Sequence, residues 1–270
     1  MWDRYRDWMY EWETRLNARD KNRVVRPLEW GLEWTEHWPC LSGTRVAAPA
    51  TPEDYLAQLN LQIVSHSDEF FSYKTPSDFR REGDFLLFTS PVETPHEVNN
   101  LARARWFPAK GRRALIVMPQ WNSDAEGHVG LAKLLNRFGV SALRMTMAYH
   151  AERKPSGLQR ADYHCSANVG RTIHACRQSV IDARACLDWL EHRGYKRIGI
   201  LGTSLGSCIA FIAAAHDPRI RTGIFNHVSM YFSDVVWTGL STQNVRQGFT
   251  ATIRIIRDMN RLLSPSRPRC

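Results

Sequence analysis

The chain has 270 residues, of which 43% are hydrophobic, and this is enough apolar material for one large buried core. A helix needs about 20 consecutive apolar residues to cross a bilayer, and the sequence contains no such run. The N-terminus also lacks the apolar segment of a secretory signal, so we expect a cytoplasmic protein without a transmembrane segment. The net charge of +9 comes from basic residues spread along the whole chain without interleaved aromatic residues, which argues against nucleic-acid binding and leaves peripheral membrane contact open.

The first part of the chain, residues 1–80, predicts a helical N-terminal extension that is rich in tryptophan. One apolar stripe at helical spacing consists of Tyr5, Trp8, Trp12 and Leu16. We expect this stripe to dock onto the rest of the protein, because acidic residues on the same helix disfavour membrane attachment. A second helix is predicted after Thr51, since a proline and two acidic residues follow it in the first turn.

Residues 81–270 predict the core of the protein, in which strands alternate with helices. Strands are expected at 84–90, 100–107, 114–118, 141–146, 198–201 and 221–228. Helices are expected at 127–138, 169–193 and 207–215, with one or two more within 238–259. This alternation indicates an α/β fold with a mostly parallel sheet that is flanked by helices.

The most informative stretch is the turn Gly202-Thr203-Ser204-Leu205-Gly206, which directly follows an apolar strand. A serine between two glycines at this spacing is typical of a sharp strand-to-helix turn that exposes the serine hydroxyl. The small apolar helix that follows supports this interpretation, and the alternative is an ordinary turn with a capping serine. We therefore predict that Ser204 is a catalytic nucleophile.

With this turn, residues 84–235 resemble the α/β-hydrolase superfamily. The resemblance implies that fold and a serine hydrolase activity that needs no cofactor or metal. In that family, the backbone N–H after the nucleophile and an N–H from the loop after the third strand bind the oxyanion, which here implies Leu205 and Trp121. The second loop reads Met118-Pro119-Gln120-Trp121, with Gln120 where the family usually has glycine.

A second resemblance lies at residues 147–155, which are similar to the Tyr-His-Gly-x-Arg loop of dienelactone-hydrolase-like and related acyl esterases. Because that loop lies near the mouth of the active site, His150 is a candidate for substrate binding. The alternative is a histidine that holds its own loop by a hydrogen bond. The family also carries an acid after a late strand, and Asp234 is the best-placed carboxylate.

The catalytic histidine is the missing part of the pattern. The family carries it after the last strand, but only His216 and His227 follow Ser204, and both are poorly placed. One explanation, which we favour, is that the chain is a shortened version of a longer hydrolase that lacks the last strands. The other is that the base comes from an earlier loop, where His128 and His150 are the candidates.

The six cysteines form no C-x-x-C pair, and three of them fall inside predicted helices. We therefore expect free thiols, without disulfides or a zinc site.

We predict from these features a serine hydrolase that acts on a small-molecule or lipid ester through an acyl-enzyme on Ser204. If the chain is a shortened version of a longer hydrolase, the enzyme could be inactive. The alternative is a non-catalytic binding or scaffold protein that keeps the fold but lacks the catalytic histidine.

Overall fold

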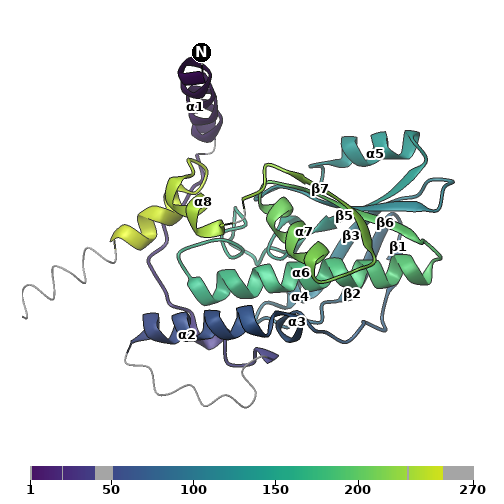
Figure 1. Ribbon diagram of the computed structural model, residues 1–270, viewed down its shortest axis with the longest axis horizontal. Helices are drawn as coiled ribbons and strands as arrows, with labels where there is room; N and C mark the ends of the chain where they lie inside the picture. Colours follow the sequence, from purple (N-terminus) through teal and green to yellow (C-terminus); the bar gives the residue numbers. More distant parts are fainter. Residues whose placement is uncertain (1, 20, 40–50, 230, 252–270) are drawn as a thin grey trace, which may run out of the picture.

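A computed structural model describes residues 2–19, 21–39, 51–229 and 231–251 of the chain. Its centre is a seven-stranded sheet with the strand order β1-β2-β3-β5-β4-β6-β7 (Figure 1). The strands are β1 (Arg80–Glu82), β2 (Phe85–Thr89), β3 (Leu101–Phe107), β4 (Arg113–Met118), β5 (Val140–Thr146), β6 (Arg197–Thr203) and β7 (Ile220–Asn226). Every strand expected from the sequence is present, and β1 adds a short hairpin at one edge.

The sheet is mixed, with a parallel half and an antiparallel half. Strands β5, β4, β6 and β7 run parallel, which confirms the parallel strands predicted from the sequence. Strands β1, β2 and β3 join them antiparallel on one side. Because β4 and β6 are parallel neighbours, their carboxyl ends lie together, and Met118 pairs with Gly202. Ligands bind at this edge in open α/β sheets.

Helices cover both faces of the sheet. The three helices that do so are α5 (Val129–Arg137), α6 (Val169–His192) and α7 (Leu205–Ala215). Ile116 of β4 belongs to the large buried core that also contains side chains of α6 and α7. Its neighbour Val117 points to the opposite face and belongs to a second core with α5. The alternation along one strand thus accounts for the three-layer α/β arrangement, which confirms the predicted fold class.

The N-terminal residues form α1 (Trp2–Arg19), η1 (Leu32–Trp34), α2 (Pro52–Ser65) and α3 (Ser67–Phe70). The side chains of Trp38, Leu59 and Phe70 are buried in the same core as α6, so this part of the extension packs on the main body. Helix α2 begins where the sequence predicts it, because the Thr51 hydroxyl accepts a hydrogen bond from the Asp54 N–H.

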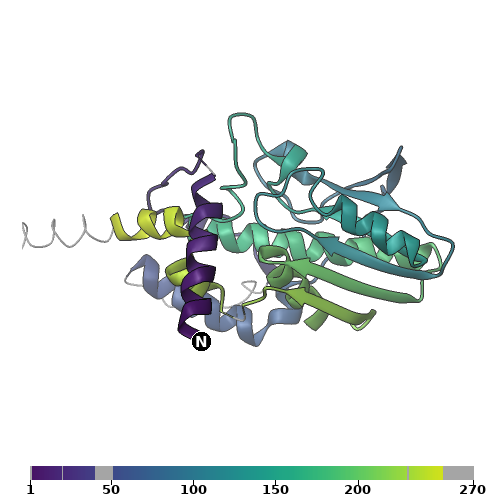
Figure 2. The same ribbon diagram turned by 90° about the horizontal axis from the view of Figure 1, so that it is seen from above.

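Helix α1 differs from the expectation that its aromatic stripe docks onto the core. Its aromatic side chains are exposed, Trp2 to 84% and Trp12 to 48%, and Figures 1 and 2 show the helix standing apart from the sheet. Ion pairs of α1 join residues of the same helix, for example Arg15 with Glu11. The helix therefore satisfies these charges without the core, and its aromatic rings face solvent.

The remaining elements are short. They are α4 (Glu97–Asn100), η3 (Ala151–Arg153) and α8 (Phe232–Thr238), and residues 243–251 are also helical. The helices predicted within 238–259 are thus found in part, and the rest of that prediction lies outside the described residues. No helix within the described ranges combines the length and the apolar character that a bilayer crossing requires.

The cysteines of the described residues are free thiols, as the sequence predicts. They are Cys165, Cys176, Cys186 and Cys208. Cys40 and Cys270 lie outside the described residues.

Candidate active site

Ser204 lies on a sharp turn between the end of β6 and the start of α7. Its backbone has φ 53° and ψ −123°, a conformation that residues other than glycine rarely adopt, and its side chain is exposed. The Ser204 N–H donates to the Asn226 carbonyl of β7 at 2.9 Å, which fixes the turn to the neighbouring strand. The turn thus holds a hydroxyl in a strained conformation at the N-terminus of a helix.

The two glycines of the turn permit close backbone contacts that no side chain would fit. A Cβ atom on Gly202 would lie 2.3 Å from the carbonyl oxygen of Gly206. A Cβ atom on Gly206 would lie 2.2 Å from the carbonyl oxygen of Pro119, which follows β4. Gly206 therefore lets α7 approach the end of β4, and the turn at Ser204 and the loop after β4 meet at the carboxyl edge of the sheet.

This contact brings together the two backbone segments that the sequence predicts as oxyanion donors. Leu205 is the first residue of α7, so its N–H has no acceptor within the helix. Trp121 lies in the loop that begins with Pro119, against which Gly206 packs. Among the described residues, neither of these two N–H groups donates a hydrogen bond to another backbone or side-chain group. Both are therefore available as donors to a bound group.

The Trp121 loop is held in place by the backbone of Ala161, a residue of the loop between β5 and α6. The Trp121 indole Nε1 donates to the Ala161 carbonyl at 3.0 Å, and the Ala161 N–H donates to Asn122 Oδ1 at 3.0 Å. Asn122 has a left-handed backbone with φ 60°. The Arg160 guanidinium lies 5.3 Å from the centre of the Trp121 indole. Sequence patterns do not reveal this clamp, because its two halves are about 40 residues apart.

Among the described residues, neither the predicted acid nor the two late histidines forms a hydrogen bond with the Ser204 hydroxyl. Asp234 lies in the first turn of α8 with an exposed side chain, and within the described residues no histidine contacts its carboxylate. His216 Nδ1 lies 2.9 Å from Asp68 Oδ1. His227 follows β7 with φ 62° and an exposed side chain. These positions assemble no acid–imidazole pair at the turn.

His128 is the described imidazole that contacts the Ser204 turn. It precedes α5 in a left-handed conformation with φ 67°, and its Nε2 lies 2.9 Å from Oγ1 of Thr203. Burial, with a smaller effect of the Arg144 charge, lowers the pKa of His128, so the imidazole is neutral at pH 7. In the part of the chain that the structure describes, no histidine lies in hydrogen-bond contact with the Ser204 hydroxyl itself.

His150 is buried, with an exposed fraction of 2%. Its Nδ1 lies 2.8 Å from the carbonyl oxygen of Ala148, and His164 Nδ1 lies 2.9 Å from the same oxygen. Both contacts fit histidines that donate Nδ1–H to this oxygen and hold the loop after β5. His150 thus fits the alternative to substrate binding, a histidine that holds its own loop by a hydrogen bond. Its Nε2 atom is buried and has no hydrogen-bond partner among the described residues. A substrate could form a hydrogen bond with His150 only if it reached this buried atom.

The same loop is anchored by a buried ion pair between Arg153 and Asp182 that no sequence pattern predicts as a pair. Nη1 of Arg153 lies 2.8 Å from Oδ2 of Asp182 in α6, and both side chains are fully buried. Arg153 also donates to the carbonyl oxygens of Asn99 and Thr146, and the hydroxyl of Ser90 donates to Asp182 Oδ1 at 2.6 Å. Arg153 occupies the arginine position of the Tyr-His-Gly-x-Arg pattern, and this match is the sequence feature that could have identified Arg153 as important.

Ala151 stands at the glycine position of that pattern. Its φ is 42°, a left-handed conformation that favours glycine. The anchored loop therefore keeps the turn at this position although the residue is alanine.

One buried and one half-buried histidine, His164 and His174, make the fold sensitive to acid. Burial lowers the pKa of His164 and of His174 to about 4 each. Their unfolded pKa is about 6.5, so their contribution is complete above pH 6.5 and is lost as the pH falls from 6.5 toward 4. We expect the free energy of unfolding to fall by about 2 kcal/mol per histidine between pH 7 and pH 5.

Denaturant unfolding at several pH values measures this loss. In His174→Gln the decrease between pH 7 and pH 5 should be smaller by about 2 kcal/mol, whereas replacement of the exposed His37 by glutamine should leave it unchanged. Equal stability of the unmodified protein at pH 7 and pH 5 would contradict this assignment.

Across the described ranges, no three His, Cys, Asp or Glu side chains converge in a way that could hold a metal ion.

The region around the Ser204 turn matches a known protein family. A family model described as "Alpha/beta hydrolase domain containing 18" matches residues 125–238, which include the Ser204 turn, α5, α6 and α7. The comparison with curated proteins gave no match.

Several solved structures are similar to the chain. Acetyl xylan esterase 1 from Thermoanaerobacterium sp. JW/SL YS485 is 17% identical over 93% of this chain and 72% of its own, with a TM-score of 0.44. A cold-adapted esterase from an Arctic intertidal metagenomic library is 23% identical over 56% of this chain and 64% of its own (TM-score 0.37). The α/β hydrolase GrgF from Penicillium sp. sh18 is 22% identical over 46% of this chain and 40% of its own (TM-score 0.37).

The chain thus spans less than two thirds of the length of GrgF and of the cold-adapted esterase. Its strand order, its Gly-x-Ser-x-Gly turn between a central strand and a helix, and the match of the family model over this region agree with one another. The sheet and the Ser204 turn therefore have the α/β-hydrolase fold.

Proposed function

We propose that the protein is a serine hydrolase that cleaves an ester through an acyl-enzyme on Ser204. The single observation that carries this proposal is the exposed Ser204 on a strained turn, with φ 53° and ψ −123°, at the carboxyl edge of the sheet. Residues outside active sites rarely keep such a conformation, because it costs about 1–3 kcal/mol. The match of residues 125–238 to an α/β-hydrolase family model supports a hydrolytic role.

In the proposed reaction, Ser204 Oγ forms a bond to the ester carbonyl carbon and loses its proton to a base. The carbonyl oxygen becomes an oxyanion, which the N–H groups of Leu205 and Trp121 stabilise. Collapse of this intermediate breaks the bond to the alcohol, which leaves with the proton. Water then attacks the acyl carbon and releases the carboxylic acid and the free serine.

The proposed base in this scheme is an imidazole, because a serine hydroxyl requires a general base at neutral pH. Among the described residues, His128 contacts the turn, but its partner is the Thr203 hydroxyl. Asp234 is proposed as the acid that orients an imidazole. The proposed substrate is a small-molecule or lipid ester, and the proposed location is the cytoplasm.

A second candidate function is a non-catalytic binding or scaffold protein of the same fold. The observation that favours it is that, within the described residues, no histidine contacts the Ser204 hydroxyl. A hydroxyl without a base is a poor nucleophile at neutral pH. The two candidates therefore differ in whether Ser204 becomes acylated.

Pre-steady-state hydrolysis of p-nitrophenyl esters with short and long acyl chains tests the proposal. A serine hydrolase should give a burst of p-nitrophenol equal to the enzyme concentration, followed by slower turnover, because acylation releases the alcohol first. The series of acyl chains reports the preferred substrate size. Release of p-nitrophenol with no burst, at the rate of buffer alone, would support the scaffold.

The Trp121 loop gives a more specific prediction. Asn122→Gly keeps the left-handed backbone at φ 60° and removes the hydrogen bond from the Ala161 N–H. We expect kcat to fall about 10-fold or more with little change in KM, since a displaced oxyanion donor weakens binding of the transition state more than that of the substrate. Replacement of the exposed Asn60 on α2 by glycine serves as control. A changed KM with an unchanged kcat would assign this loop to substrate binding instead.

A further inference from the structure

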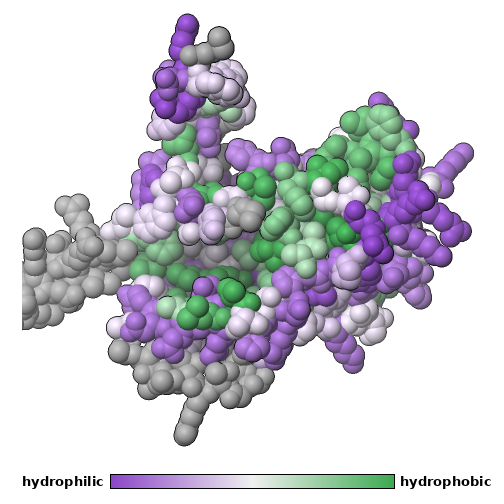
Figure 3. All heavy atoms as spheres, viewed as in Figure 1, coloured by the Kyte–Doolittle hydropathy of each residue, from purple (hydrophilic) through white to green (hydrophobic). Residues whose placement is uncertain are grey.

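The amino edge of the sheet, opposite the Ser204 turn, carries an unusual concentration of positive charge. Six exposed basic residues lie in the segments that meet there: Lys110, Arg112, Arg113, Arg137, Lys196 and Arg197. Arg113 and Arg197 are direct neighbours across the paired strands β4 and β6. Figure 3 shows hydrophilic residues gathered at this end of the molecule, beside an apolar area over α5. We call these six residues the basic edge.

The cations of the basic edge lack acidic partners. Within the described residues, none of the six forms an ion pair. The acidic residues nearby in the chain are engaged elsewhere or lie toward the far strands. Glu191 pairs with Arg219, Glu82 pairs with Arg80, and Asp84 precedes β2. A face with this many unopposed charges attracts a polyanion or an anionic surface.

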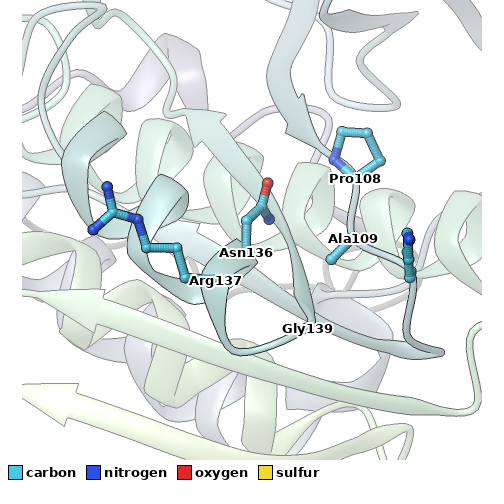
Figure 4. A pocket seen from close by; sticks show the side chains of 6 residues that line it. Pro108, Ala109, Asn136, Arg137 and Gly139 are labelled. Carbon is cyan, nitrogen blue, oxygen red and sulfur yellow. The ribbon is translucent and has the colours of Figure 1, made fainter.

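Exposed apolar side chains lie directly beside these charges. Phe138 follows α5 and is 69% exposed, and Leu134, four residues earlier, is 46% exposed. The Phe138 carbonyl accepts a hydrogen bond from Arg113 Nη2 at 3.1 Å, so the ring and the charge are neighbours. Lys110 and Arg137 line one open hollow of about 620 Å³ between the loop after β3 and the end of α5 (Figure 4).

We propose that the basic edge, with Phe138 and Leu134, docks the protein onto an anionic membrane surface. Basic side chains bind the anionic headgroups, and the two apolar side chains enter the boundary between headgroups and acyl chains. Exposed apolar residues favour a lipid surface over a nucleic acid, whose backbone would match the charges but would leave Phe138 and Leu134 in water. The inference does not depend on the proposed hydrolase function, since this edge lies opposite the Ser204 turn.

Sedimentation of the full chain with vesicles tests the proposal. Binding is expected to vesicles of equimolar phosphatidylcholine and phosphatidylserine and to be much weaker to vesicles of phosphatidylcholine alone. The double variant Lys110→Glu and Arg137→Glu should lower the partition coefficient by about 100-fold or more, because each basic residue near an anionic surface contributes a factor of about five and reversal doubles the effect. The matched control, Lys21→Glu and Lys74→Glu, changes the net charge equally at exposed positions outside this edge.

A second pair of variants separates apolar insertion from charge. Phe138→Ser should weaken the binding that persists at high salt, whereas Leu61→Ser on α2, which removes a side chain that is 70% exposed, should not. Equal losses in the lysine control and the edge variant would overturn the proposal. So would binding of polyglutamate or nucleic acid at the basic edge without binding to anionic vesicles. Circular dichroism of each variant verifies that it is folded.

Discussion

Replacement of Ser204 by alanine is expected to reduce the burst and turnover of p-nitrophenyl esters by about 10⁴-fold or more, close to the rate of buffer. The reason is that Ser204 is the proposed acceptor of the acyl group, and Ser207 cannot replace it because it is buried and its hydroxyl donates to the Ser204 carbonyl. The effect should appear in kcat with the protein still folded, because Ser204 is exposed and its side chain supports no contact in the core.

The control for this variant is Ser233→Ala, which removes an exposed hydroxyl from α8. Its kinetics should match those of the unmodified protein. Retention of more than a tenth of the activity in Ser204→Ala would show that hydrolysis takes place elsewhere on the protein or without a covalent intermediate.

Replacement of Asp182 by alanine is expected to lower the free energy of unfolding by about 3–5 kcal/mol. The variant leaves the Arg153 guanidinium fully buried without its carboxylate, which lies 2.8 Å away. It also removes the acceptor of the Ser90 hydroxyl. Because Arg153 ties the loop after β5 to Asn99 and Thr146, the loss should also loosen the segment that carries His150.

Urea unfolding followed by tryptophan fluorescence measures this change. The double variant Arg153→Met with Asp182→Leu should lose much less stability, since neither charge then remains buried alone. Replacement of Glu11, which pairs with Arg15 on the exposed surface of α1, should have little effect. A loss of less than about 1 kcal/mol in Asp182→Ala would mean that water compensates the Arg153 charge.

The fold could be predicted from the sequence because its signals are local. Strand β4 is a continuous apolar run, and Gly202 and Gly206 flank Ser204 at the spacing that a strand-to-helix turn requires. The structure adds the physical reason for Gly206, whose missing side chain lets α7 reach the Pro119 carbonyl. The antiparallel half of the sheet was less clear from the sequence, since short strands of either direction show the same alternation.

The site could be predicted less fully because its contacts join distant segments. The contact of His128 with Thr203 spans 75 residues, and the clamp of Ala161 on Trp121 spans 40. The burial of His150 depends on the loop around it, which no spacing in the sequence reveals. The prediction for the aromatic stripe on α1 was wrong although its pattern is local and regular. The helical spacing there predicts docking onto the core, but Trp8 and Trp12 remain exposed.

The most direct test of the central claim, that Ser204 is an activated nucleophile, is labelling of the folded full chain with a fluorophosphonate, followed by mass spectrometry of its peptides. We expect one phosphonylated site, at Ser204, with labelling lost when the protein is unfolded by urea beforehand, because activation depends on the turn and on the donors around it. A folded protein that stays unlabelled at Ser204 would show that this serine is not an activated nucleophile.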